Sequence, residues 1–144
     1  MKLGLGQSYD RVQFLSKKTR AYLDVVKPAS TVGIAGGFFL ALVFYSYYTG
    51  QPDLFIQEID TVVFAVVTAA LAHGGAQAMN MAEDAEMDRQ TPHKQNRPIP
   101  SGVISEEEAR SIAWIMFSLA IGRGFMVNWR FGTLIMAMSL MGVF

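Results

Sequence analysis

Two long stretches without a charged side chain constrain this sequence more than any other feature. No Asp, Glu, Lys or Arg occurs between Lys27 and Asp53, or between Asp60 and Glu83. Each stretch exceeds the ~20 residues that a helix needs to cross the hydrocarbon core of a bilayer. Since a segment inside lipid must satisfy its own backbone hydrogen bonds, we expect an all-α, polytopic membrane helix bundle.

Residues 1–144 are predicted to form one membrane domain with about four membrane helices. Their expected ranges are 28–48, 61–79, 109–127 and 131–144. In the first, Gly33-x-x-x-Gly37 favours close helix approach. The third follows a capping box, Ser105-Glu-Glu-Glu108, and contains Arg123, which has to pair or reach the interface. The fourth is still apolar at Phe144, so we expect a fragment of a longer protein or a naturally short form.

Residues 1–27 are expected to form a cytoplasmic amphipathic arm at the membrane surface. Apolar residues recur there at helical spacing, with basic residues between them (Val12, Leu15, Tyr22, Leu23 and Val26; Arg11, Lys17, Lys18 and Arg20). The segment 49–60 has no Lys or Arg, whereas the arm and residues 89–110 are basic. This charge bias predicts that the N-terminus and the segment after the second span are cytoplasmic, with Arg123 and Arg130 as exceptions.

Composition excludes several function classes. The net charge is zero, which gives no electrostatic reason to expect a nucleic-acid partner. The chain has no cysteine, which excludes disulfides, thiolate metal sites and cysteine nucleophiles.

Asn80, Asp84 and Asp88 follow each other at a spacing of four, where the second apolar stretch ends. On a helix this spacing places them on one slowly drifting face. Amide and carboxylate oxygens suit Mg²⁺, which keeps some of its waters and is commonly completed by substrate phosphates. We therefore predict that these three residues are metal ligands at a diphosphate site.

Two neighbouring segments extend this candidate site. His73 and Gln77 continue the same helix face into the apolar stretch, where they either line a cavity or bridge helices. Residues 80–104 are expected to form an Asp-rich active-site loop, which includes Lys94 and ends in the rigid turn Arg97-Pro-Ile-Pro-Ser-Gly102.

The two patterns together, Asn80-x-x-x-Asp84-x-x-x-Asp88 and Arg97-Pro-Ile-Pro-Ser-Gly102, resemble those of the UbiA family of intramembrane prenyltransferases. The resemblance covers the N-terminal half of a fold with usually about nine spans. It implies Mg²⁺-dependent transfer of a prenyl group from its diphosphate to a hydrophobic acceptor. The acceptor would be an aromatic ring, as in quinone, haem or chlorophyll precursors, or a glycerol phosphate ether of archaeal lipids.

The resemblance also implies residue roles. Asp84, Asp88 and Arg97 would be catalytic, with Asn80, Asp84 and Asp88 on the metal. Asn80 and Arg97 would bind substrate, with Lys94 as a nearby candidate. Gln77 and His73 are added as substrate-binding candidates from their place on the same helix face. The leaving diphosphate would be neutralised by the metal and the basic loop, while the apolar helices exclude water.

Two features depart from the family pattern. Met81 stands where many members have Asp immediately after the Asn, and nothing after Asp88 repeats the Asp-rich motif. Glu83 and Glu86 are expected to be solvated or salt-bridged. Three interpretations stay open: part of a longer prenyltransferase, a short protein that pairs with itself or with another half, and a non-catalytic membrane protein that binds isoprenyl diphosphate.

Overall fold

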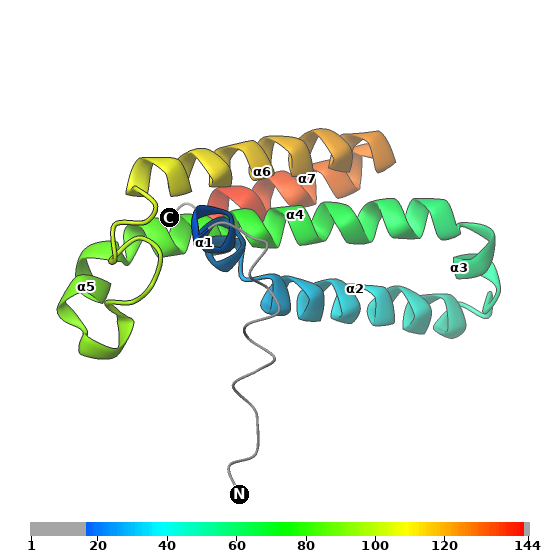
Figure 1. Ribbon diagram of the computed structural model, residues 1–144. Coiled ribbons are helices and arrows are strands. Elements are labelled where there is room, and N and C mark those ends of the chain that lie inside the picture. The colour runs from blue at the N-terminus through cyan, green and yellow to red at the C-terminus, as the bar shows by residue number, and fades with distance from the viewer. Residues whose placement is uncertain (1–16, 143–144) are drawn as a thin grey trace, which may run out of the picture.

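The computed structural model describes residues 17–142, and these residues form helices and turns with no strand (Figure 1). The predicted all-α class is therefore confirmed. The elements are α1 (Lys17–Val26), α2 (Pro28–Tyr48), α3 (Leu54–Gln57), α4 (Ile59–Glu83), α5 (Ala85–Gln90), the short 3₁₀ helix η2 (Pro92–Lys94), α6 (Glu106–Val127) and α7 (Trp129–Met141). Arg11, Val12 and Leu15 of the predicted arm lie outside the described residues.

Three helical stretches are long and apolar enough to cross a bilayer: Lys17–Tyr48, Ile59–Glu83 and Glu106–Val127. The first predicted span coincides with α2, and the second ends earlier than α4, which continues to Glu83. The fourth predicted span corresponds to α7, which has 13 residues. Residues 17–142 thus contain three candidate spans, and the 13 described residues of α7 do not test the fourth prediction, which runs to residue 144.

Helix α4 lies at the centre of the bundle, with α2 on one side and α6 and α7 on the other (Figure 1). Its glycines allow α6 to approach closely. A Cβ atom on Gly75 would lie 2.9 Å from the Phe117 ring and 3.2 Å from the Ala113 carbonyl oxygen. The close approach predicted at Gly33 and Gly37 is not made within residues 17–142, where no described atom lies within 4 Å of a Cβ built at either position.

Helix α6 begins with the predicted capping box. The Ser105 hydroxyl accepts from the Glu108 N–H at 3.1 Å, and the Glu108 carboxylate accepts from the Ser105 N–H at 2.9 Å. This reciprocal pair satisfies two donors that a helix start otherwise leaves unpaired.

Arg123, farther along α6, pairs with neutral groups of α4. Its guanidinium donates to the Thr68 hydroxyl and to the Phe64 carbonyl, each at 3.3 Å, and lies 3.7 Å from the centre of the Phe64 ring. The polar groups and the aromatic face together stabilise a charge within the apolar bundle.

Helix α1 packs on the same end of the bundle as the segment that follows α5 (Figure 1). Its Ala21 and Val25 are buried in a cluster that also contains Ile99 and Ile104. Leu23 is 45% exposed, so an apolar side chain of this helix also faces away from the protein. The chain then bends into α2 at Lys27, which has a positive φ of 45°.

Candidate active site

The residues of the Asp motif lie on two nearly continuous helices. The Asp84 N–H donates to the Asn80 carbonyl at 2.9 Å, and the Asp88 N–H donates to the Asp84 carbonyl at 2.8 Å. Asn80 therefore occupies the last turn of α4, Asp84 the junction, and Asp88 the body of α5. The segment expected as a loop from residue 80 is helical as far as Gln90, since the helical hydrogen bonding continues past the apolar residues.

Asn80 and Asp84 are both exposed. Because they are one turn apart, their oxygens lie on the same side of the helix. Met81, at the position where the family pattern often has an acidic residue, is only 5% exposed and belongs to the hydrophobic core. Among the three motif residues, the exposed oxygen ligands are therefore the Asn80 amide and the Asp84 carboxylate.

Asp88 has different surroundings, because it is completely buried beneath the segment that follows it. Arg97 Nη1 donates to one carboxylate oxygen at 2.6 Å, and Lys94 Nζ forms an ion pair with the other at 2.9 Å. The Lys94 ammonium and then the Arg97 guanidinium hold the pKa of the Asp88 carboxyl below its ordinary value, although burial acts in the opposite direction. Asp88 is thus charged at neutral pH and neutralised by two cations.

The segment that carries these cations is folded rather than extended. The Pro98 carbonyl accepts from the N–H groups of Val103 and Ile104 at 3.0 and 3.2 Å. Gly102 has φ +74°, a left-handed conformation that favours glycine. Ile99 and Ile104 are buried, and this fixes the turn predicted from the proline pattern.

A second set of contacts ties α5 to α6 and to the segment that follows α5. Arg89 pairs with Glu86 at 2.9 Å and with Glu106 at 2.7 Å. The Gln95 side chain donates to the Arg89 carbonyl at 3.0 Å. Glu86 is thus salt-bridged, as expected for a carboxylate outside the motif, and Glu83 is exposed.

His73 both bridges helices and lines a cavity. Its Nε2 lies 3.0 Å from the Ser30 hydroxyl of α2 and 3.5 Å from the Gln77 amide nitrogen. The cavity has a volume of about 230 Å³ and lies between α2, α4 and α7, with His73 as the polar residue among apolar walls that include Phe38 and Phe131. Gln77 is not among its lining residues.

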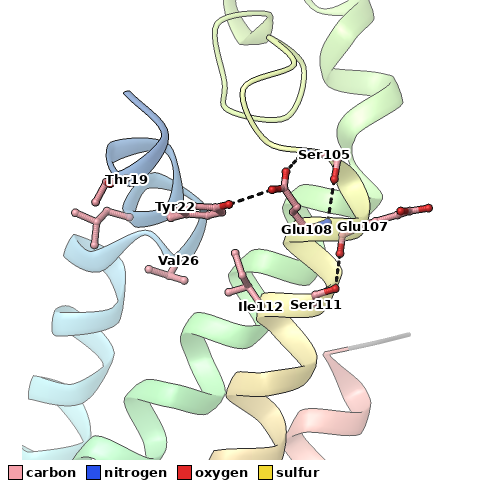
Figure 2. A pocket seen from close by; sticks show the side chains of 9 residues that line it. Thr19, Tyr22, Val26, Ser105, Glu107, Glu108, Ser111 and Ile112 are labelled. Atoms are coloured by element: carbon pink, nitrogen blue, oxygen red, sulfur yellow. Dashed lines mark hydrogen bonds between the residues drawn. The ribbon is translucent and has the colours of Figure 1, made fainter. Parts of the chain in front are cut away.

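A shallower hollow of about 690 Å³ lies between α1 and the start of α6 (Figure 2). Tyr22 donates to Glu108 at 3.0 Å across it, and Lys18 forms a 2.7 Å ion pair with the same carboxylate. Sequence reasoning assigned Glu108 only to the helix cap, and it missed the link to α1 because the contact joins residues far apart in the chain. Asn80, Asp84 and Asp88 do not line this hollow.

The donor set at positions 80 and 84 fits a magnesium ion. An exposed amide oxygen and an exposed carboxylate one turn apart are hard ligands that leave most coordination positions to water and phosphate. Among residues 17–142, no three His, Cys, Asp or Glu side chains lie together as metal ligands would. The roles of Asn80, Asp84, Asp88, Lys94 and Arg97 therefore stay predictions, with Asp88 set apart from the exposed pair by its cations.

The described residues form a helical bundle with three helices apolar enough to cross a membrane, and the acidic helix α5 pairs with the basic residues that follow it. Comparison with known proteins identifies the family: a model of the UbiA prenyltransferase family matches residues 36–144. The chain therefore belongs to the UbiA prenyltransferase family, and with its three apolar helices it is an integral membrane protein.

Similar curated proteins are named protoheme IX farnesyltransferases. Those of Korarchaeum cryptofilum and Archaeoglobus fulgidus are both 28% identical to this chain, over 82% and 83% of its length. A protoheme IX farnesyltransferase 2 of Mesorhizobium japonicum is 35% identical over 70% of the chain. The chain spans only 37%, 39% and 35% of the lengths of these three relatives. No solved structure matches it.

Proposed function

We propose that this chain contributes the first diphosphate-binding half of a Mg²⁺-dependent prenyltransferase. The observation that carries the proposal is the exposed pair Asn80 and Asp84, which lie one turn apart at the end of α4. Lys94 and Arg97, which we call the basic turn, lie at the same end because both pair with Asp88. The family membership supports the same reaction class. The relatives' names suggest a farnesyl group as the prenyl group and protoheme IX as the acceptor.

The proposed site separates the charged and apolar parts of the donor. Asn80 and Asp84 would hold Mg²⁺, which when bound supplies positive charge to the diphosphate oxygens. Lys94 and Arg97 donate hydrogen bonds to the same diphosphate. The positive charges of Lys94 and Arg97 stabilise the negative charge that develops on the leaving oxygen as the prenyl C–O bond breaks.

The apolar cavity beside His73 is the proposed shelter for the prenyl chain. His73 precedes Asn80 by seven residues on α4, which corresponds to about 10 Å along the helix axis. Apolar walls such as Phe38 and Phe131 exclude water from the cation-like prenyl carbon. The acceptor then forms its bond to that carbon and releases a proton, while the diphosphate leaves with the electron pair of the broken bond. Gln77, which contacts His73, is proposed to orient that side chain.

We further propose that the N-terminus and the Asp motif face the cytoplasm. Basic residues flank the apolar helices at the end of the bundle that carries the Asp motif. They lie before α2 (Lys17, Lys18, Arg20 and Lys27) and from α5 to the start of α6 (Arg89, Lys94, Arg97 and Arg110). The α2–α4 connection at the opposite end has no Lys or Arg between residues 49 and 60.

The rest of the cavity is proposed to come from further helices, either of the same polypeptide or of a second copy, since the chain spans less than two-fifths of the lengths of the relatives named above.

A transfer assay tests the proposed activity. The protein expressed from its full reading frame is incubated with Mg²⁺, labelled farnesyl diphosphate and protoheme, with geranylgeranyl diphosphate as the alternative donor. We expect a labelled, prenylated acceptor that requires Mg²⁺. Donor binding without any turnover on aromatic or glycerol phosphate ether acceptors would contradict an enzymatic role and favour a binding protein.

A further inference from the structure

We propose that Asp88 is a positioning residue that holds Lys94 and Arg97 for the donor diphosphate, and that the metal is held by Asn80 and Asp84 without it. This inference rests on the proposed diphosphate site. Of the three equally spaced residues, Asn80 and Asp84 would bind the metal, and Asp88 would hold the basic turn that contains Lys94 and Arg97.

The first argument is the accessibility of the carboxylates. Asp88 is 0% exposed, and each of its oxygens lies beside a cation: Oδ2 accepts a hydrogen bond from Arg97 at 2.6 Å, and Oδ1 lies 2.9 Å from Lys94 Nζ in an ion pair that lacks hydrogen-bond geometry. A metal ion could reach Asp88 only by displacing one of these positive groups. Asp84 is exposed and has no ion pair within residues 17–142, so it can take a metal without such an exchange.

The second argument concerns the cations. The side chains of Lys94 and Arg97 are 29% and 37% exposed. An ammonium has three N–H donors and a guanidinium has five, and the contact with Asp88 uses one nitrogen of each side chain. The remaining donors suit phosphate oxygens, because an arginine fork binds two such oxygens at once. Both side chains can therefore stay on Asp88 while they bind a diphosphate.

The third argument is the position of Asp88 in the fold. It belongs to α5, which continues from α4, whereas Lys94 ends the short helix η2 and Arg97 lies three residues later in the turn that follows. Within that turn the Arg97 N–H donates to the Lys94 carbonyl at 3.0 Å, so the two cations share one local backbone unit. The ion pairs with Asp88 fix the orientation of this unit relative to the helix that carries Asn80 and Asp84.

Calorimetric titration with inorganic pyrophosphate at a series of Mg²⁺ concentrations separates the two roles. The protein from its full reading frame is used in detergent, as wild type, Asp84→Asn, Asp88→Asn and Glu83→Gln. Glu83→Gln is the matched control, because Glu83 is an exposed carboxylate next to Asp84. We expect Asp88→Asn to weaken pyrophosphate binding about tenfold at every Mg²⁺ concentration, with the half-saturating Mg²⁺ concentration unchanged within about twofold. Asp84→Asn should raise that Mg²⁺ concentration about tenfold or more.

A double-mutant cycle tests whether Asp88 acts through Arg97. If it does, Asp88→Asn combined with Arg97→Gln binds pyrophosphate no more than about twofold more weakly than the weaker single variant. Effects that multiply, or a half-saturating Mg²⁺ concentration that rises in Asp88→Asn as in Asp84→Asn, would overturn the proposal.

A second variant keeps the test decisive if Asp88→Asn does not fold, which thermal unfolding followed by circular dichroism will show. Lys94→Met combined with Arg97→Gln releases the Asp88 carboxylate from its cations. If Asp88 only positions them, pyrophosphate binding weakens and the half-saturating Mg²⁺ concentration does not fall. If Asp88 is a ligand, its release lowers that concentration and overturns the proposal. A wild-type protein that binds no pyrophosphate with Mg²⁺ would instead overturn the proposed function itself, and the positioning role with it.

Discussion

Asp84 and Asp88 are identical side chains one helical turn apart that lie in opposite surroundings. The first is exposed at the α4–α5 junction, and the second is buried against Lys94 and Arg97. A carboxylate that already has two cations gains less from a metal ion than one that faces water, because it must first give up its partners. Equal spacing in the sequence therefore does not imply equal roles.

The ion pairs of Asp88 predict a pH dependence of stability. Since its pKa is lowered from an ordinary value of 3.8, its contribution is fully present above that value and is lost as the pH falls through the lowered pKa. We expect the difference in thermal stability between wild type and Asp88→Asn to be constant from neutral pH down to about pH 4. Below that pH, the difference should shrink as the Asp88 carboxylate is protonated. A difference that grows on acidification would contradict the pairing.

Arg123 is the second residue with a specific prediction. Replacing it with Met removes two long hydrogen bonds to α4 and the contact with the Phe64 ring. We expect a loss of about 1–2 kcal/mol in the free energy of unfolding, measured by thermal or denaturant unfolding in detergent. Arg130→Met is the control, because Arg130 is exposed and should change stability by less than about 0.5 kcal/mol. Equal effects of the two substitutions would contradict a special role for Arg123.

At the scale of helices, the packing of α4 against α6 depends on glycine. Gly75→Ala would place a Cβ atom 2.9 Å from the Phe117 ring, whereas Gly33→Ala meets no described atom within 4 Å. We expect Gly75→Ala to destabilise the protein by about 1–3 kcal/mol and Gly33→Ala to be neutral or stabilising by up to about 1 kcal/mol. Thermal unfolding of the two variants provides the comparison, and a reversed order would rule out this packing.

These elements show which features could be predicted from the sequence. The charge-free stretches identified α2 and α4, and four consecutive residues sufficed for the Ser105–Glu108 cap, because both signals are local. The burial of Asp88 depends on the turn that folds back over it. Close helix packing occurs at Gly75 and not at Gly33 within the described residues, and this difference depends on which helix faces meet. Neither is contained in the spacing of a single segment.

At the scale of the whole molecule, the bundle is an integral membrane protein whose acidic helix end and basic turn lie together. Its orientation can be tested with single cysteines because residues 1–144 contain none. In cells or intact right-side-out vesicles, a single cysteine at Gln51 should react with a membrane-impermeant maleimide, and one at Ser101 should react only after the membrane is permeabilised. The opposite pattern would show that the Asp motif faces outward.

The measurement that tests the central claim most directly is Mg²⁺-dependent binding of farnesyl diphosphate to the protein from its full reading frame, with Asp84→Ala and Asp88→Ala beside wild type. We expect saturable binding that requires Mg²⁺ in the wild type and a loss of donor binding in both variants, through the metal for Asp84 and through the basic turn for Asp88. Unchanged binding in both variants would contradict the assignment of this helix end as the diphosphate site.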